Sequence, residues 1–266
     1  MIYKLKNMIL RKPAMAGFLL ILSIYGNNVN AQSGWYITSS VQVSGGRYIF
    51  ESYNRVFSLY NGIRYEGDNF GISAFIPILT SNYKNISASN GILTPSETTN
   101  SKSVQDFGLG DLYGYFDYKI FSNYEDELDV LINARIKIPT ASTYMNVGTG
   151  EYDFGTSISI RKSWQNFISV IDLGYLKIGD PNGITYQDPF TYGIGIGRFF
   201  NYGEYSFLLY YTGYTKIVEV YDAPQQLSLG LNYRASKNII ISAIGSEGIG
   251  NFAPDFSLSG GIKVQL

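Results

Sequence analysis

The sequence predicts an all-β fold, an antiparallel transmembrane β-barrel of about 12 strands with periplasmic N- and C-termini. Three observations predict it. From Gln32 onward, apolar and polar residues alternate with a period of two in segments of about 10 to 14 residues, long enough to cross a bilayer at a tilt. Short turns between these segments alternate with longer loops. Aromatic residues gather near the segment ends, where the girdles of a membrane barrel lie.

The start of the chain is predicted to be a targeting segment. Residues 1–31 contain basic but no acidic side chains, and an apolar run occupies 14–25. That run of about 12 residues is shorter than the about 20 that a membrane-spanning helix needs, and Ala31 is a small residue suited to cleavage. We therefore expect a secretory signal peptide over 1–31 and an outer-membrane β-barrel over 32–266.

The alternation places the strands along the remaining chain. It is clearest over 127–139, where even-numbered residues are apolar and odd-numbered residues are mostly polar or charged. The predicted strands are 35–44, 54–66, 69–80, 106–121, 127–139, 152–163, 166–179, 189–200, 204–217, 225–235, 237–247 and 255–266. The longest connection, 81–105, is either a mobile external loop or a constriction folded into the mouth.

A secreted β-sandwich or a water-soluble barrel would show the same alternation with its apolar face turned inward. The polar faces here are rich in Gly, Ser and Tyr rather than in Lys and Glu. Charged residues make up only 15% of the chain, below the roughly 25% of ordinary soluble domains. Both observations favour a barrel whose apolar face contacts outer-membrane lipid.

Composition also excludes several classes of function. The chain contains no Cys and no His, which removes thiolate nucleophiles, thiolate and imidazole metal ligands, and every catalytic triad built on His. We therefore predict no enzyme, no cofactor and no metal site. The formal net charge of −1 provides no basic surface for phosphates, so nucleic acid is not an expected partner.

Four short motifs follow one another in the part of the chain from Asp106 onward, roughly 60% of its length. They are Gly108-Leu109-Gly110-Asp111, Ile138-Pro139-Thr140, Gly148-Thr149-Gly150 and Gly179-Asp180. With them, this stretch resembles the outer-membrane barrel family of meta-pathway phenol degradation transporters. The resemblance implies passage of small, aromatic or hydrophobic compounds across the bacterial outer membrane. The segment 259–266 is similar to the closing strand that the barrel-assembly machinery reads, which makes that machinery an expected partner.

Side chains on the inward faces are the candidate solute-binding groups. The candidates are Asp111, Tyr113, Tyr115, Arg135, Lys137, Asp153, Asp172 and Tyr210. The charged residues of the lumen either bind a solute or neutralise one another across neighbouring strands.

The inward parity also predicts strand registers. We expect Lys119 opposite Asp129 and Asp111 opposite Lys137, because the alternative register would set Asp117 against Asp129.

Across the next loop, the same parity places Arg161 beside Asp129 and Asp153 beside Lys137. The sequence thus predicts one charge ladder of Lys119, Asp129 and Arg161 toward the periplasm. A second ladder of Asp111, Lys137 and Asp153 lies toward the outer mouth. Asp172 has no basic residue at its own depth on the preceding strand, so we expect it to serve a solute or a distant Arg.

The function expected from these residues is a narrow channel for a small-molecule solute. Twelve strands lie between the eight that side chains fill and the sixteen or more that leave a wide aqueous pore. Inward tyrosines would narrow the lumen further. A structural or surface-interaction barrel with a plugged lumen is the alternative.

Overall fold

The computed structural model describes residues 33–46, 54–81, 86–89, 92–95, 106–141, 149–180, 185–217, 222–249 and 253–266. The expected signal peptide over 1–31 lies outside the described residues. In chain order the strands are β1 (Gly34–Gly46), β2 (Asn54–Glu66), β3 (Phe70–Ser81), β4 (Ile86–Ser89), β5 (Ile92–Pro95), β6 (Asp106–Leu109), β7 (Leu112–Asn123), β8 (Leu128–Ile138), β9 (Asp153–Trp164), β10 (Phe167–Lys177), β11 (Phe190–Phe200), β12 (Tyr205–Tyr214), β13 (Gln225–Arg234), β14 (Ile239–Ile249) and β15 (Phe256–Gln265).

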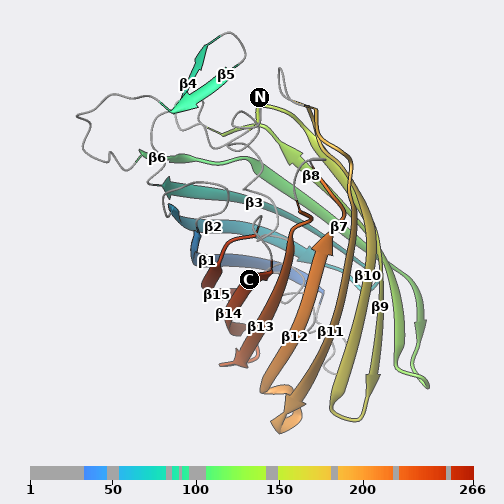
Figure 1. The fold of residues 1–266 in the computed structure, drawn as a ribbon. Helices are drawn as coiled ribbons and strands as arrows, with labels where there is room; N and C mark the ends of the chain where they lie inside the picture. The colour runs from blue at the N-terminus through green and yellow to red at the C-terminus, as the bar shows by residue number, and fades with distance from the viewer. Residues whose placement is uncertain are drawn as a thin grey trace.

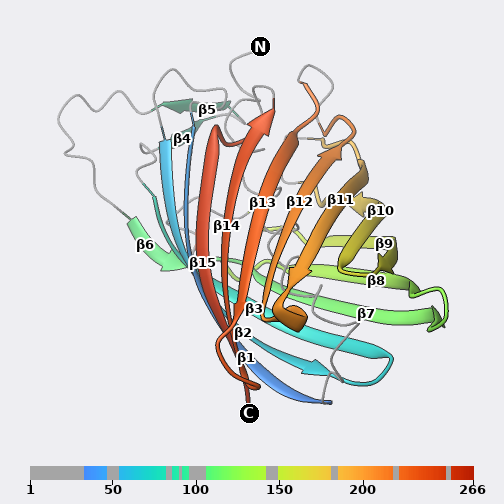
Figure 2. The same cartoon turned by 90° about the horizontal axis from the view of Figure 1, so that it is seen from below.

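The strands close into one antiparallel barrel (Figures 1 and 2). Each wall strand pairs with its neighbour along the chain, and β1 pairs with both β2 and β15, which closes the sheet. β6 and β7 follow each other along the same edge of β3, so twelve wall positions result from a 13-stranded sheet. The predicted fold class is confirmed. Among the described residues, no helix is long and apolar enough to cross a membrane.

The two ends of the barrel differ in their connections. Five tight turns, such as 67–69 and 235–238, lie at one end of the barrel. The start of β1 and the finish of β15 lie at the same end, which we call the short-turn end. The longer connections, such as 139–152 and 178–189, lie at the opposite, long-loop end. The turns are tight enough to require left-handed backbone at Gln165, where φ is 54°, and at Asn201 and Tyr202 in the 3-10 helix η4 (Asn201–Gly203).

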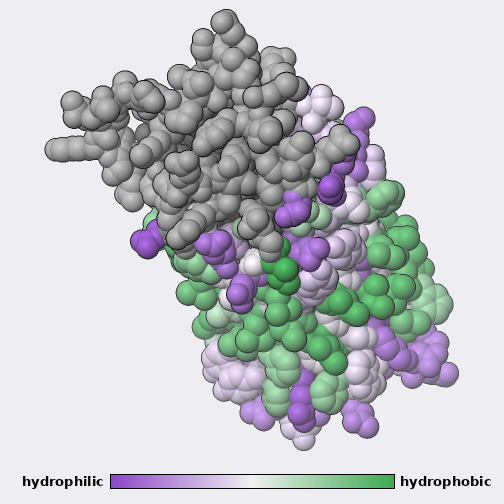
Figure 3. Space-filling view, viewed as in Figure 1, coloured by the Kyte–Doolittle hydropathy of each residue, from purple (hydrophilic) through white to green (hydrophobic). Residues whose placement is uncertain are grey.

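The outer face of the wall is apolar. Outward side chains such as Leu173, Ile194 and Val41 are 63%, 58% and 59% exposed, whereas their inward neighbours are largely buried. Hydrophobic residues cover the middle of the strands, and hydrophilic residues lie toward the short-turn end (Figure 3). Near that end, aromatic rings stack on the outer face, among them Tyr205 on Tyr233 with centroids 5.0 Å apart. This pattern is that of a membrane-facing belt with an aromatic girdle.

Three features differ from the sequence-based prediction. The predicted strand 106–121 is broken at Gly110 and Asp111 into β6 and β7. The segment 81–105, expected as a loop, contains the β4–β5 hairpin, a separate two-stranded sheet. In the pairing of β7 with β8, Lys137 lies opposite Tyr113 and not, as predicted, opposite Asp111. The register also shifts by one residue at a bulge around Ile120.

The register predicted for β8 and β9 is confirmed. Asp129 lies opposite Arg161, and Lys137 lies opposite Asp153. A bulge adds one unpaired residue to a strand, and no turn or glycine in the sequence of β7 marks its position. The register of β7 and β8 was wrong because the turn lies over 124–127, where Asn123 pairs with Leu128, further along the chain than predicted. The bulge then offsets one residue of this shift.

Candidate functional site: the barrel lumen

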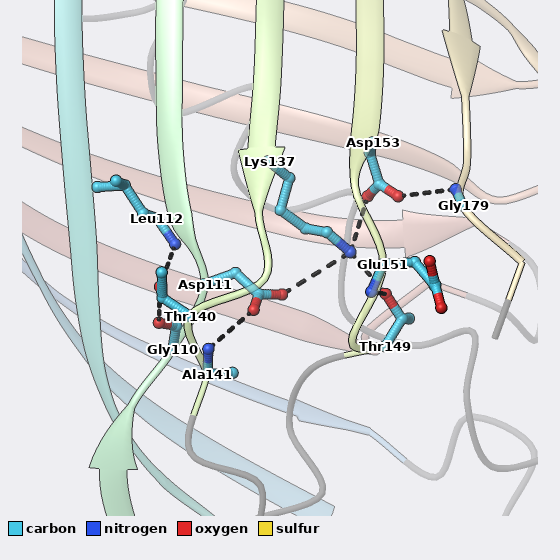
Figure 4. Close-up of polar contacts among 10 residues, drawn as sticks. All are labelled: Gly110, Asp111, Leu112, Lys137, Thr140, Ala141, Thr149, Glu151, Asp153 and Gly179. Atoms are coloured by element: carbon cyan, nitrogen blue, oxygen red, sulfur yellow. Dashed lines mark hydrogen bonds and ion pairs between the residues drawn. The ribbon is translucent and has the colours of Figure 1, made fainter.

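A cluster centred on Lys137 occupies the long-loop end of the lumen (Figure 4). The ammonium of Lys137 lies 3.8 Å from a carboxylate oxygen of Asp111 and 3.1 Å from one of Asp153. It also donates a hydrogen bond of 2.7 Å to the hydroxyl of Thr149. All three charged residues are buried, Lys137 to 3% exposure. The residues of the ladder predicted toward the outer mouth are therefore in contact with one another. Asp111 and Lys137 meet diagonally rather than face to face.

Each carboxylate of this cluster also holds a loop. Asp111 accepts a hydrogen bond from the backbone N–H of Ala141, and Asp153 accepts one from that of Gly179, both at 3.1 Å. The hydroxyl of Thr140 spans the break between β6 and β7, accepting from the N–H of Leu112 and donating to the carbonyl of Gly110. The cluster thus ties the first residues of β7 and β9 to the loops that follow β8 and β10.

The four motifs that carry the family resemblance meet in this cluster. Gly110 and Asp111 come from the first, Thr140 from the second, Thr149 from the third and Gly179 from the fourth. Two glycines of these motifs fit special backbone positions. Gly150 has φ of 76°, and a side chain on Gly179 would lie 2.5 Å from the backbone carbonyl of Tyr152. The contacts and backbone geometry at the long-loop end of the lumen therefore explain the residues of these motifs.

A second charge network lies toward the short-turn end. Arg64 makes ion pairs of 2.8 Å with both Glu66 and Asp117, and Lys263 lies 2.5 Å from Glu66. The pair of Arg64 and Asp117 joins β2 to β7 past β3. The pair of Lys263 and Glu66 joins β15 to β2 past β1. Glu66 was missing from the predicted inward set, although the parity of its strand, which places Arg64 inward, also places Glu66 inward.

The predicted periplasmic ladder joins this network. Lys119 lies 3.9 Å from Asp129, which also accepts a hydrogen bond of 2.6 Å from Ser122. Arg161 lies opposite Asp129 and in the electrostatic field of Asp172 and Asp117. The residues of this ladder lie close together, and protein groups compensate their charges.

Asp172 lies in the middle of β10 and is held by two hydroxyl donors. Ser159, directly opposite on β9, donates to one carboxylate oxygen, and Tyr210 donates to the other at 2.7 Å. Tyr210 comes from β12 and reaches Asp172 across β11, where Gly193 and Gly195 leave room for its ring. The prediction that Asp172 would face the lumen without an opposite cation is consistent with these contacts, but its partners are hydroxyl groups of the protein.

Opposite the charged strands, the lumen wall is apolar near the short-turn end. Ile168, Val170, Leu208 and Ile244 pack with Tyr210 in one buried cluster. Their strands, β10, β12 and β14, turn these side chains inward, and Phe199 packs against them. These inward apolar residues were not among the predicted lumen groups, which were ionisable residues and tyrosines.

The open space of the lumen is a cavity of about 160 Å³. Its walls combine Arg64, Arg135, Arg161, Lys263, Asp117 and Asp172 with the aromatic rings of Phe75, Tyr115, Tyr210 and Tyr214. A much smaller space of about 20 Å³ lies beside Tyr113, Lys137 and Asp153. Arg135 and Tyr115 line both spaces. Within the described residues, no cluster of acidic side chains could hold a metal ion.

Solved structures with the same fold identify the type of barrel. An outer membrane channel from Pseudomonas putida F1 superposes with a TM-score of 0.68 at 9% identity, over 91% of this chain and 98% of its own. The NanC porin follows with 0.56 at 11% identity, over 87% and 100%. The KdgM porin gives 0.52 at 7% identity, over 87% and 99%.

The chain has the fold of outer-membrane channels and porins. At these identities the likeness is one of fold. No protein-family model and no curated protein sequence matches the chain. The resemblance of residues 106–266 to the phenol degradation transporters therefore stays a prediction.

Proposed function

We propose that this outer-membrane barrel is a narrow channel for small, hydrophobic or aromatic solutes. The observation that carries the proposal is a closed barrel, apolar outside, whose polar lumen contains a cavity of about 160 Å³. A cavity of about 150 Å³ lined by apolar side chains holds benzene in an engineered protein, so this space suits a single aromatic ring. An oligosaccharide would need a wider path.

The chemistry of the wall supports the same class of solute. The rings of Phe75, Tyr115, Tyr210 and Tyr214, which line the cavity, provide surfaces on which a planar ring can pack. The resemblance to phenol degradation transporters points to the same class. Because the four motifs meet in one cluster, they support that relationship as a set, although each of them is short.

The route and the orientation are part of this proposal. Residues 1–31 act as a signal peptide that directs export across the inner membrane. The barrel-assembly machinery then recognises the last strand, β15, and inserts the barrel with both termini on the periplasmic side. β1 begins and β15 finishes at the short-turn end. This supports that orientation, since barrels of this kind keep short turns in the periplasm.

Uptake and permeability measurements test the proposal. A deletion strain should take up one or more small aromatic compounds more slowly than the wild type, and the gene supplied in trans should restore the rate. Liposomes containing the purified barrel should pass such compounds and exclude oligosaccharides. Free passage of oligosaccharides, or an unchanged uptake across the screen, would contradict the proposal.

One observation favours the plugged-barrel alternative. Arg135 on β8 and Tyr214 on β12, four wall positions away, line the same cavity and lie within electrostatic range of each other, so these two side chains face each other across the lumen. A barrel closed at this level would bind partners at its surface rather than conduct solutes. Single-channel recording decides between the two, because a plugged barrel gives no conductance.

A further inference from the structure

Arg135 differs from four other cationic side chains of the lumen. Arg64, Lys119, Lys137 and Lys263 each form an ion pair with an inward carboxylate. Among the residues that the structure describes, no carboxylate forms an ion pair with Arg135. Asp153 lies within its electrostatic range but is paired with Lys137 at 3.1 Å.

The position of Arg135 is built into the wall. Its neighbour on β9 is Gly155, and a side chain at that position would lie 2.7 Å from both Cγ and Nε of Arg135. The missing side chain therefore lets Arg135 lie across β9. On the other side, Tyr115 of β7 lies directly opposite Arg135. These neighbours hold the guanidinium at the boundary between the two spaces of the lumen.

Tyrosine rings and hydroxyls surround this guanidinium. Tyr60 and Tyr214 each lie within electrostatic range of Tyr115, and Arg135 lies within range of Tyr115 and Tyr214. The ring of Tyr115 packs edge-on against Phe75 with centroids 6.0 Å apart. A guanidinium carries five N–H donors in a planar fork that matches a carboxylate, and Tyr214 lies near it on the wall of the same cavity. Phenolic hydroxyls add further donors, and the aromatic faces suit a planar ring.

We infer that Arg135, with Tyr115 and Tyr214, binds the carboxylate of a small aromatic acid whose ring occupies the cavity of about 160 Å³. This inference rests on the proposed function, since it names the charged group of the solute that the channel passes. It also gives the proximity of Arg135 and Tyr214 a second role. A carboxylate bound to the guanidinium would lie between Arg135 and Tyr214 and separate the two side chains that face each other across the lumen.

The binding test uses benzoate and its neutral isostere benzamide on the purified full-length barrel in detergent. Calorimetric titration should show that benzoate binds more tightly than benzamide. Arg135→Gln should weaken benzoate binding by about tenfold or more, the effect of losing a charge-assisted hydrogen bond. Arg135→Lys should retain part of the affinity, because it keeps the charge but loses the fork.

The matched control is Arg198→Gln. Arg198 lies on the outer face of β11, over the rings of Phe167 and Phe200 at 5.1 and 5.0 Å, so this variant removes the same charge outside the lumen. It should leave benzoate binding unchanged. Gly155→Ala should weaken binding without removing the arginine, because the added methyl group displaces it. Heat-modifiable migration on a gel checks that each variant is folded.

Conductance across a planar bilayer separates this inference from the proposed function. A conducting barrel that binds benzoate and benzamide equally, or whose benzoate binding survives Arg135→Gln, overturns the inference and leaves the channel proposal standing. Arg135-dependent benzoate binding in a barrel without conductance supports the site and overturns the channel. Conductance that benzoate blocks in the wild type but not in Arg135→Gln supports both.

Discussion

Replacing Lys137 by methionine removes the only cation of the cluster in Figure 4. The buried carboxylates of Asp111 and Asp153 then repel each other without a positive charge between them. With an effective dielectric constant of about 20, unit charges 3.1 and 3.8 Å apart attract by about 5 and about 4 kcal/mol before desolvation is subtracted. Breaking a buried ion pair by removing one partner typically costs about 3–5 kcal/mol. We expect Lys137→Met to lower the free energy of unfolding by that amount.

A triple variant distinguishes loss of charge balance from loss of packing. Lys137→Met combined with Asp111→Asn and Asp153→Asn is uncharged, yet both amide oxygens can still accept the backbone N–H groups of Ala141 and Gly179. Replacing a buried ion cluster by neutral groups of similar size is often close to neutral, so the triple variant should recover most of the lost stability.

Urea unfolding of the barrel in lipid vesicles measures both variants. The chain has two tryptophans, Trp35 and Trp164, 49% and 40% exposed on the outer face, whose fluorescence reports the loss of lipid contact. If Lys137→Met unfolds at the wild-type urea concentration, or if the triple variant is as unstable as the single one, the charge argument is wrong.

Further predictions concern the two faces of the wall and the location of the barrel. Leu229→Arg places a charge in the lipid near the middle of β13 and should cost about 2–4 kcal/mol, whereas Gly230→Ser on the lumen face should cost less; equal losses in urea unfolding would reject the assigned facing. Gly193→Ala should push Tyr210 away from Asp172 and lower stability by about 1–3 kcal/mol, with Tyr210→Phe giving a similar loss, since each leaves a buried carboxylate short of one donor. In cell fractionation the protein should appear in the outer membrane as a heat-modifiable band, and recovery from the soluble periplasm would contradict the proposed location.

Strand number and facing could be predicted because a membrane barrel repeats one physical requirement along its whole length. Each wall strand needs an apolar residue toward lipid at every second position, and β8 satisfies this without a break from Leu128 to Ile138. The same parity placed Arg135 and Asp172 in the lumen. Charge pairing then gave the right register for β8 and β9, where no irregularity intervenes.

Contacts that depend on irregular backbone or on long side chains could not be predicted in this way. The turn over 124–127 lies further along the chain than predicted, and the break at Gly110 leaves no periodic signal, so one register and one strand were wrong. Lys119 still reaches Asp129, because a lysine spans the diagonal to a residue two positions away. The proximity of Arg135 to Tyr214 depends on the curvature of the five strands from β8 to β12, which a pairwise register does not contain.

The pairing that closes the wall has a consequence for the order of assembly. Tyr36 pairs with Gln265, and the N–H of Leu266 donates to the carbonyl of Trp35 at 2.9 Å, so the seam joins nearly the first and the last strand residues of the chain. Neighbouring hairpins form over short chain separations, whereas this seam carries the largest loop-closure entropy of the wall. Until β15 arrives, both β1 and β14 present open edges that can pair with any other extended chain. Synthesis produces β1 before β15. In the interval between the two, this sheet must be kept from pairing with a neighbouring molecule.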